Sequence, residues 1–276
     1  MPSLPLAGLH PAPRRTIHSA VAGLGVHRPN PDRSSAGFVT VEPTGVSQRV
    51  KGDHGVTTPW LAQGAARAAL DASGVPASEI QLVVVGTSTP DVLWPSTACL
   101  VQTELGLPMV ASFDLYAAEA GLLTALAVAD RFVRSGTRAA LVIGAEAERQ
   151  LVNLPGQRGG QQRGVASAVV LAGSSDDTGI LATVAGGATG VDPTPMASAD
   201  WMKVAADACL ARAGLRPEQV DLVIREQTAA PLIALFDAVA DGRVRRGSVV
   251  LLVSCGAGAG WAATCLRWGG APTAEW

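Results

Sequence analysis

The sequence repeats itself, and this repeat most constrains the fold. The stretch Ala65–Gly74 resembles Ala205–Gly214, and the apolar pair Leu82-Val83 matches Leu222-Val223 at the same offset. A second match, at a smaller offset, pairs Ala129, Asp130, Val133, Arg134, Gly136, Leu141 and Val142 with Ala240, Asp241, Val244, Arg245, Gly247, Leu252 and Val253. Chance similarity between alanine-rich helices would not align both strands, so we infer a duplicated helix–strand–helix–strand unit. The fall in offset predicts that the second copy lacks a segment corresponding to Pro95–Gly121.

Short apolar runs alternate with alanine-rich stretches along the chain. The runs are mostly rich in valine and cover residues 82–85, 139–143, 168–171, 222–224 and 249–253. Such runs are typical of central strands that are buried on both faces of a sheet. Helices are predicted over residues 59–73, 121–135, 199–213 and 231–241. The alternation predicts an α/β protein with helices covering the sheet, and a hydrophobic content of 48% allows a large core.

The stretch Ala111–Leu126 predicts a candidate site. It has the pattern of a buried strand, then a tight turn of small residues from Ala117 to Ala120, then a helix. Such a turn presents one side chain at the start of the helix, where free N–H groups and the helix dipole favour negative charge. In this chain the presented side chain is the carboxylate of Glu119.

Composition and charge exclude several functions. The net charge of −2 gives no electrostatic footprint for nucleic acid or an anionic membrane. No apolar run reaches the length of about 18 residues that a membrane span needs, and the proline-rich start has no signal-peptide core. We therefore expect a cytoplasmic protein with a flexible tail over residues 1–16. The chain has four cysteines, Cys99, Cys209, Cys255 and Cys265, and their spacing does not fit a metal site. We expect them to be free thiols. We also expect no cofactor.

Several motifs together resemble β-ketoacyl-acyl-carrier-protein synthase III of the thiolase superfamily. The motifs are Thr44–Val46 with Arg49, Thr87–Asp91, Trp94–Gln102, Leu105-Gly106, Phe113-Asp114, Ala117-Ala118, Ala125-Leu126, Leu141–Glu146, Asp241–Val253 and Gly256–Gly260. The resemblance runs from about Ile17 to Trp268. It implies a thiolase-like fold with five layers in the order αβαβα and a truncated second half. It also implies halves over residues 17–175 and 176–276, and dimerisation through the sheet of the first half.

The sequence departs from this family at the catalytic residues. The family carries its acyl group on a Cys in the turn, and Glu119 occupies that position. The family's catalytic His follows a second-half strand, where this chain has Glu226, and no histidine occurs after His54. The family's catalytic Asn falls within the shortened tract of the second copy. The resemblance therefore implies that all three catalytic residues are lost.

Glu119 cannot replace the thiol in condensation. A carboxylate cannot hold a stable thioester, and an acyl–carboxyl anhydride would hydrolyse. Like charges on Glu119 and Glu226 at about 4 Å would repel by about 4 kcal/mol at an effective dielectric of about 20. Two roles stay open for Glu119: a carboxylate that accepts N–H groups at the helix start, or a general base that promotes decarboxylation.

Three further residues are candidates for a pocket or partner site. In the family, an aromatic residue before the Pro-Ser-Thr-Ala-Cys motif crosses the dimer interface and lines the acyl tunnel of the partner, and Trp94 occupies that place. An ordinary interface or core aromatic would explain Trp94 equally well. The family's glycine loop lines the active site with backbone, which suggests the same for Gly256 and Gly258. The loop has no Lys-Ser/Thr ending, which argues against a phosphate loop.

Two functions are compatible with this sequence. In the first, the chain is a non-catalytic subunit that forms a heterodimer or heterotetramer with a catalytic synthase III-like chain. The chain then resembles the non-catalytic subunit of heterodimeric alkylquinolone-type synthases. Such synthases act in secondary metabolism of the fatty-acyl or polyketide type. In the second, it is a decarboxylase or acyltransferase that uses Glu119. A homodimer also stays open, as does an acyl carrier protein or acyl-CoA as a further partner.

Overall fold

The computed structural model describes residues 18–27, 56–147, 164–174, 179–187, 198–256, 260–271 and 273–275. Five α-helices occur in this part of the chain: α1 (Thr58–Ser73), α2 (Thr97–Glu104), α3 (Gly121–Arg134), α4 (Ser198–Ala213) and α5 (Ala230–Ala240). Its strands are β1 (His18–His27), β2 (Ile80–Gly86), β3 (Ala111–Leu115), β4 (Ala139–Glu146), β5 (Val165–Ser174), β6 (Gly179–Gly187), β7 (Leu222–Arg225), β8 (Val249–Cys255), β9 (Gly260–Arg267) and β10 (Thr273–Glu275). The four predicted helices are confirmed to within one residue at either end. The predicted tail over residues 1–16 lies outside the described residues.

Local signals explain where the helices begin and end. The hydroxyl of Thr57 accepts the N–H of Trp60 at the start of α1, and Gly74 ends that helix with a φ of +63°. Threonine is favoured at such starts because its oxygen satisfies an N–H group that has no partner within the helix. Glycine is favoured at such ends because it adopts the left-handed conformation without strain.

The strands form two sheets with the same pairing pattern. The first sheet has the order β10-β1-β5-β4-β2-β3, and the second has the order β6-β9-β8-β7. In each sheet a parallel pair, β2 with β4 or β7 with β8, is followed by antiparallel neighbours. The internal repeat of the sequence is therefore visible as a repeat of strand arrangement.

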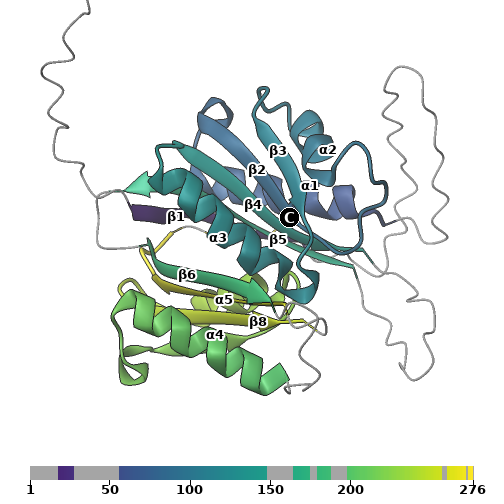
Figure 1. The fold of residues 1–276 in the computed structure, drawn as a ribbon. Helices are drawn as coiled ribbons and strands as arrows, with labels where there is room; N and C mark the ends of the chain where they lie inside the picture. The colour runs from purple at the N-terminus through teal and green to yellow at the C-terminus, as the bar shows by residue number, and fades with distance from the viewer. Residues whose placement is uncertain are drawn as a thin grey trace, which may run out of the picture.

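The helices and sheets stack in five layers (Figure 1). Helix α1 packs on one face of the first sheet, while α3 contacts strands of both sheets and α4 covers the outer face of the second sheet. Helix α5 contacts β1 and β5 of the first sheet as well as β7 and β8 of the second. This is the thiolase-like αβαβα arrangement that the resemblance implied.

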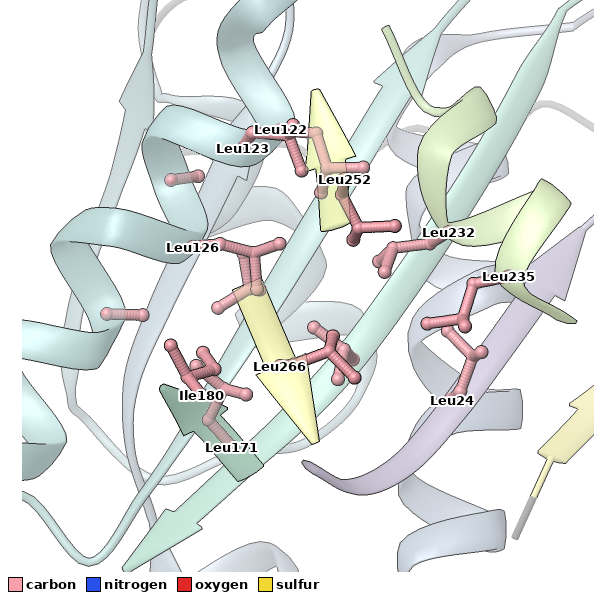
Figure 2. Close-up of a cluster of buried hydrophobic side chains, with 14 of the residues drawn as sticks. Leu24, Leu122, Leu123, Leu126, Leu171, Ile180, Leu232, Leu235, Leu252 and Leu266 are labelled. Atoms are coloured by element: carbon pink, nitrogen blue, oxygen red, sulfur yellow. The ribbon is translucent and has the colours of Figure 1, made fainter. Parts of the chain in front are cut away.

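A leucine-rich core joins the two sheets. Figure 2 shows Leu122, Leu123 and Leu126 of α3 and Leu232 and Leu235 of α5, with residues from strands of both sheets among them. Each of these five leucines is at most 3% exposed. The central helices therefore bury apolar faces against both sheets at once.

A partly buried ion pair on α3 also bonds to a strand of the second sheet. Asp130 on α3 accepts the Nε–H of Arg134 at 2.8 Å, and Arg134 donates to the carbonyl oxygen of Ile180 on β6 at 2.6 Å. The Asp130 side chain is 3% exposed, and the hydroxyl of Thr183 lies 3.5 Å from its second oxygen. A helix of the first half is thus bonded to a strand of the second.

The second half lacks the unit that covers the outer strands of the first. The chain runs from β7 to α5 through only residues 226–229, whereas α2 and β3 lie between β2 and the turn before α3. Val223 on β7 is 38% exposed, while Val83, its counterpart on β2, is fully buried beside Ala98 and Val101 of α2. The prediction that β7 is a strand buried on both faces is therefore wrong, because nothing equivalent to α2 covers it among the described residues.

Two further strands differ from expectation. The sequence pattern predicts a buried β3, but this strand lies at the edge of its sheet, with Ala111 exposed and the other residues half-buried. β10 pairs in parallel with β1, so residues 273–275 return to the first sheet. The division into halves at residue 175 stays a prediction.

Candidate functional site

The turn around Glu119 lies between β3 and α3. Ala118–Ala120 form a single 3-10 turn, closed by a 3.0 Å hydrogen bond from the N–H of Ala120 to the carbonyl oxygen of Ala117. Ala118 has a φ of +45°, in the left-handed region that residues other than glycine seldom adopt. Gly121 then starts α3, and a Cβ on Gly86 would lie 2.5 Å from its carbonyl carbon. The small residues let the turn pass close to the end of β2.

Two segments of the second half bond to this turn. The carbonyl oxygen of Glu119 accepts the N–H of Thr228 at 2.7 Å and the hydroxyl of Ser254 at 2.8 Å. Thr228 has a φ of +56°, so it and Ala118 are the two non-glycine residues with positive φ in the described part of the chain. Strained backbone of this kind clusters at functional sites. The site is therefore where two strained turns meet, one from each half.

The Glu119 carboxylate lies against the glycine that follows β8. A Cβ on Gly256 would collide with Oε2 of Glu119 and would lie 3.3 Å from the backbone nitrogen of that residue. The N–H of Gly256 donates to the carbonyl oxygen of Gly260 at 2.8 Å, which closes the base of the glycine loop. Gly256 thus lies at the site, whereas Gly258 falls outside the described residues.

The Gly256→Ala variant tests this contact. We expect it to displace the Glu119 carboxylate and to lower the unfolding free energy by about 1 kcal/mol, the low end for an overpacked site. In a Glu119→Ala background the same change should cost less, because the carboxylate is gone and only the 3.3 Å contacts with the backbone nitrogen of residue 119 and the Cβ of Ala118 stay. Urea denaturation of the two single variants and the double variant measures this coupling. Equal costs in both backgrounds would contradict the contact.

Glu226 lies at the same edge but points to solvent. Its backbone N–H donates to the carbonyl oxygen of Val253 at 3.2 Å, and its side chain is exposed. Thr228, two residues further on, makes the contact with the Glu119 turn. The role of Glu226 at the family's His position stays a prediction.

Sequence reasoning missed Gln227, whose amide lies at this site. Its Nε2 donates to the carbonyl oxygen of Cys255 at 2.8 Å, so the side chain links the ends of β7 and β8. The position of Gln227 directly after Glu226 could have indicated that it lies near the site. Its contact with Cys255 could not be predicted, because the two residues are 28 positions apart in the sequence. The site therefore holds a neutral amide as well as carboxylates.

Burial and the charge of Glu119 set the ionisation of two neighbours. Burial raises the pKa of the Cys255 thiol, and the negative charge of Glu119 raises it further. Burial also raises the pKa of Glu146, with a smaller contribution from Glu119 in the same direction. Because a thiol with a raised pKa carries little thiolate, Cys255 is a poor nucleophile.

Cys209 and Cys265 are also poor nucleophiles. All four are free thiols, as expected, and burial raises the pKa of Cys209 to about 12 and that of Cys265 to about 11. Cys99 is half-buried on α2, where its thiol lies 3.7 Å from the carbonyl oxygen of Ser112. None of these thiols replaces the family's cysteine at the turn.

Trp94 lies apart from Glu119, on the loop between β2 and α2. Trp94 and its neighbour Leu93 are each 86% exposed, and Met109, just before β3, is 99% exposed. Met109 directly precedes β3, which is the edge strand of the first sheet. An ordinary core role for Trp94 is therefore wrong.

The described residues hold neither a metal cluster nor a membrane-spanning helix. No group of three or more His, Cys, Asp or Glu side chains there has a geometry that could hold a metal ion. None of the described helices has the length and hydropathy needed to span a bilayer.

Comparison with known proteins identifies the family. Residues 113–189 match the family model described as 3-oxoacyl-[acyl-carrier-protein] synthase III, and residues 226–268 match the model of its C-terminal region. The chain is 33% identical to β-ketoacyl-[acyl-carrier-protein] synthase III of Xanthomonas campestris pv. campestris, over 92% of this chain and 99% of the relative. The chain belongs to the 3-oxoacyl-acyl-carrier-protein synthase III family.

Solved structures agree with this assignment. The 3-oxoacyl-(acyl carrier protein) synthase III, FabH, from Pseudomonas aeruginosa PAO1 matches with a TM-score of 0.73 and 26% identity, covering 91% of this chain and 98% of that one. The priming β-ketosynthase from the R1128 polyketide biosynthetic pathway matches with a TM-score of 0.75 and 25% identity, covering 96% and 100%. The alignment with the Xanthomonas synthase III extends over 323 residues, more than the 276 of this chain, so that relative carries segments that this chain lacks.

Proposed function

We propose that this chain is a non-catalytic subunit that pairs with an active synthase III-like chain. The observation that carries the proposal is the carboxylate of Glu119 in the turn where the resemblance puts the acylated cysteine. Around this turn, Cys255 is buried with a raised pKa, and the thiol chemistry of the family has no other candidate nucleophile among the described residues. The active chain would supply the Cys, His and Asn that this chain lacks.

The exposed apolar residues support pairing. Leu93 and Trp94 lie on the loop between β2 and α2, Met109 directly precedes the edge strand β3, and large apolar side chains this exposed are candidates for an interface. In this proposal the partner's first-half sheet meets β3, and Trp94 closes the partner's acyl pocket. The similarity to a priming β-ketosynthase of a polyketide pathway favours secondary metabolism of fatty-acyl or polyketide type. An acyl carrier protein or acyl-CoA would then deliver the acyl group to the partner.

Acylation provides the first test. After incubation with acyl-CoA, we expect intact-protein mass spectrometry to detect no stable adduct on the isolated chain, because a carboxylate forms no stable thioester. Peptide mapping of residues 117–121 locates any adduct that forms. Stable acylation within those residues would refute the non-catalytic role.

Assembly and turnover provide the second test. Size-exclusion chromatography of the chain with an active synthase III-like chain should give a mixed species with equal amounts of each, and activity should require both. The alternative is an enzyme that uses Glu119 as a general base, and the two strained turns that meet at Glu119 are the observation in its favour. Turnover by the isolated chain, lost in Glu119→Gln, would support that alternative.

A further inference from the structure

The loop that carries Trp94, residues 87–96, is held by hydrogen bonds at its base and exposes apolar side chains at its tip. Ser88 donates its backbone N–H and its hydroxyl to the two carboxylate oxygens of Glu146, at 2.8 and 2.9 Å. The hydroxyl of Thr89 accepts the N–H of Ala147 at 2.9 Å, and its carbonyl oxygen accepts the hydroxyl of Thr58. These bonds fasten the loop to the end of β4 and to the start of α1.

The far side of the loop is fixed as well. The hydroxyl of Ser96 accepts the N–H of Cys99, and Asp114 on β3 accepts the N–H groups of Thr97 and Ala98 at 2.7 and 2.8 Å. Between the two anchored ends, Leu93 and Trp94 are each 86% exposed. A fixed loop with a bare apolar tip loses little conformational entropy on binding, which is the general advantage of a preorganised anchor.

Glu146 is the unusual member of this framework. It is a charged residue only 7% exposed, and both of its carboxylate oxygens accept donors from Ser88. Burying a carboxylate costs folding free energy unless hydrogen bonds compensate for the lost hydration. A buried carboxylate therefore indicates that its charge or its hydrogen bonds have a role. A neutral Gln at this position would form only weaker, uncharged hydrogen bonds with Ser88, because bonds to an ionised carboxylate are stronger.

We propose that Glu146 is the positioning residue of the partner-binding loop: its two bonds to Ser88 hold the Leu93–Trp94 tip in the conformation that the partner chain receives. The proposal rests on the proposed function for the identity of that partner, an active synthase III-like chain. The new element is that Glu146 influences the affinity for the partner chain without contacting that chain, because it acts through the conformation of the loop. Glu119 is linked to this residue, since its negative charge contributes to raising the pKa of Glu146.

The first experiment needs no partner. A nitroxide spin label on Leu93→Cys, in a Cys99→Ser background, reports the mobility of the tip by electron paramagnetic resonance. We expect Glu146→Gln and Ser88→Ala to make the label more mobile. Glu79→Gln serves as the control, because Glu79 is a surface residue that pairs with Arg138 away from this loop. An unchanged spectrum in Glu146→Gln would overturn the proposal.

A pH series distinguishes positioning from general structural support. Protonation of Glu146 removes the negative charge that strengthens its bonds to Ser88, so the tip should loosen as the pH falls through the pKa of Glu146. Glu119→Gln removes a negative charge that raises this pKa, so the loosening should move to lower pH. A pH midpoint that does not move in Glu119→Gln would contradict the link between the two residues.

The second experiment measures assembly with the active synthase III-like chain by sedimentation velocity. Glu146→Gln should weaken the complex about ten-fold through the cost of ordering a loosened loop, while Glu79→Gln should leave it unchanged. Full affinity in Glu146→Gln despite a mobile tip would overturn the proposal. If the unmodified chain does not bind, the proposed function fails, and the spin-label result still reports on the Glu146 bonds.

Discussion

Replacing Asp130 by alanine is expected to lower the unfolding free energy by about 2–4 kcal/mol, because it leaves the Arg134 guanidinium without its carboxylate at the junction of the halves. Asp130 is the buried member of the pair, with a side chain 3% exposed against 26% for Arg134, and Arg134 also donates to the carbonyl oxygen of Ile180. Urea denaturation followed by circular dichroism measures the loss.

The chain offers a matched control for this variant. Lys203 and Asp207 on α4 form an ion pair with the same spacing of four residues, but both side chains are more than half exposed. Asp207→Ala should therefore change stability by no more than about 0.5 kcal/mol. Similar losses in Asp130→Ala and Asp207→Ala would contradict a structural role for the buried pair.

Replacing Trp94 by alanine should weaken the complex with an active synthase III-like chain at least about 30-fold, the effect of losing about 2 kcal/mol at an interface hot spot. It should leave the fold of the isolated chain unchanged, because the Trp94 side chain is 86% exposed. If Trp94 lines the partner's pocket, the residual complex should also show an altered preference for acyl chain length.

Sedimentation velocity and product analysis by mass spectrometry check both effects. The matched control is Phe132→Ala, since Phe132 is also exposed, at 42%, but lies near the C-terminal end of α3 and not on the loop that carries Trp94. Equal affinity in the unmodified chain and in Trp94→Ala would exclude the loop as a contact surface.

The fold was readable from the sequence where the signal was local or repeated. Alanine-rich stretches predicted four of the five described α-helices to within one residue, α2 (Thr97–Glu104) being the exception, and the small residues at 117–120 predicted the turn of Glu119. The duplication, with its shorter second copy, indicated the pairing of two similar sheets.

The rest depended on contacts between distant residues. The sequence pattern predicts a buried β3 because periodicity does not tell where a strand lies in a sheet, and β10 is too short, at three residues, to give a pattern. The bonds from Thr228 and Ser254 to Glu119, and from Ser88 to Glu146, join residues 58 to 135 positions apart. Such contacts follow from the packing of elements that are far apart in the chain, which no local pattern encodes.

The placement of β10 has a consequence for how the molecule comes apart. Strands β1 to β5 belong to the first sheet and β6 to β9 to the second. The chain then returns to the first sheet, where residues 273–275 pair with β1. Separation of the second half from the first would therefore break the pairing of β10 with β1. It would expose an edge of the first sheet, and exposed sheet edges promote aggregation. Melting should accordingly proceed as one transition in calorimetry, with both halves lost together rather than in sequence.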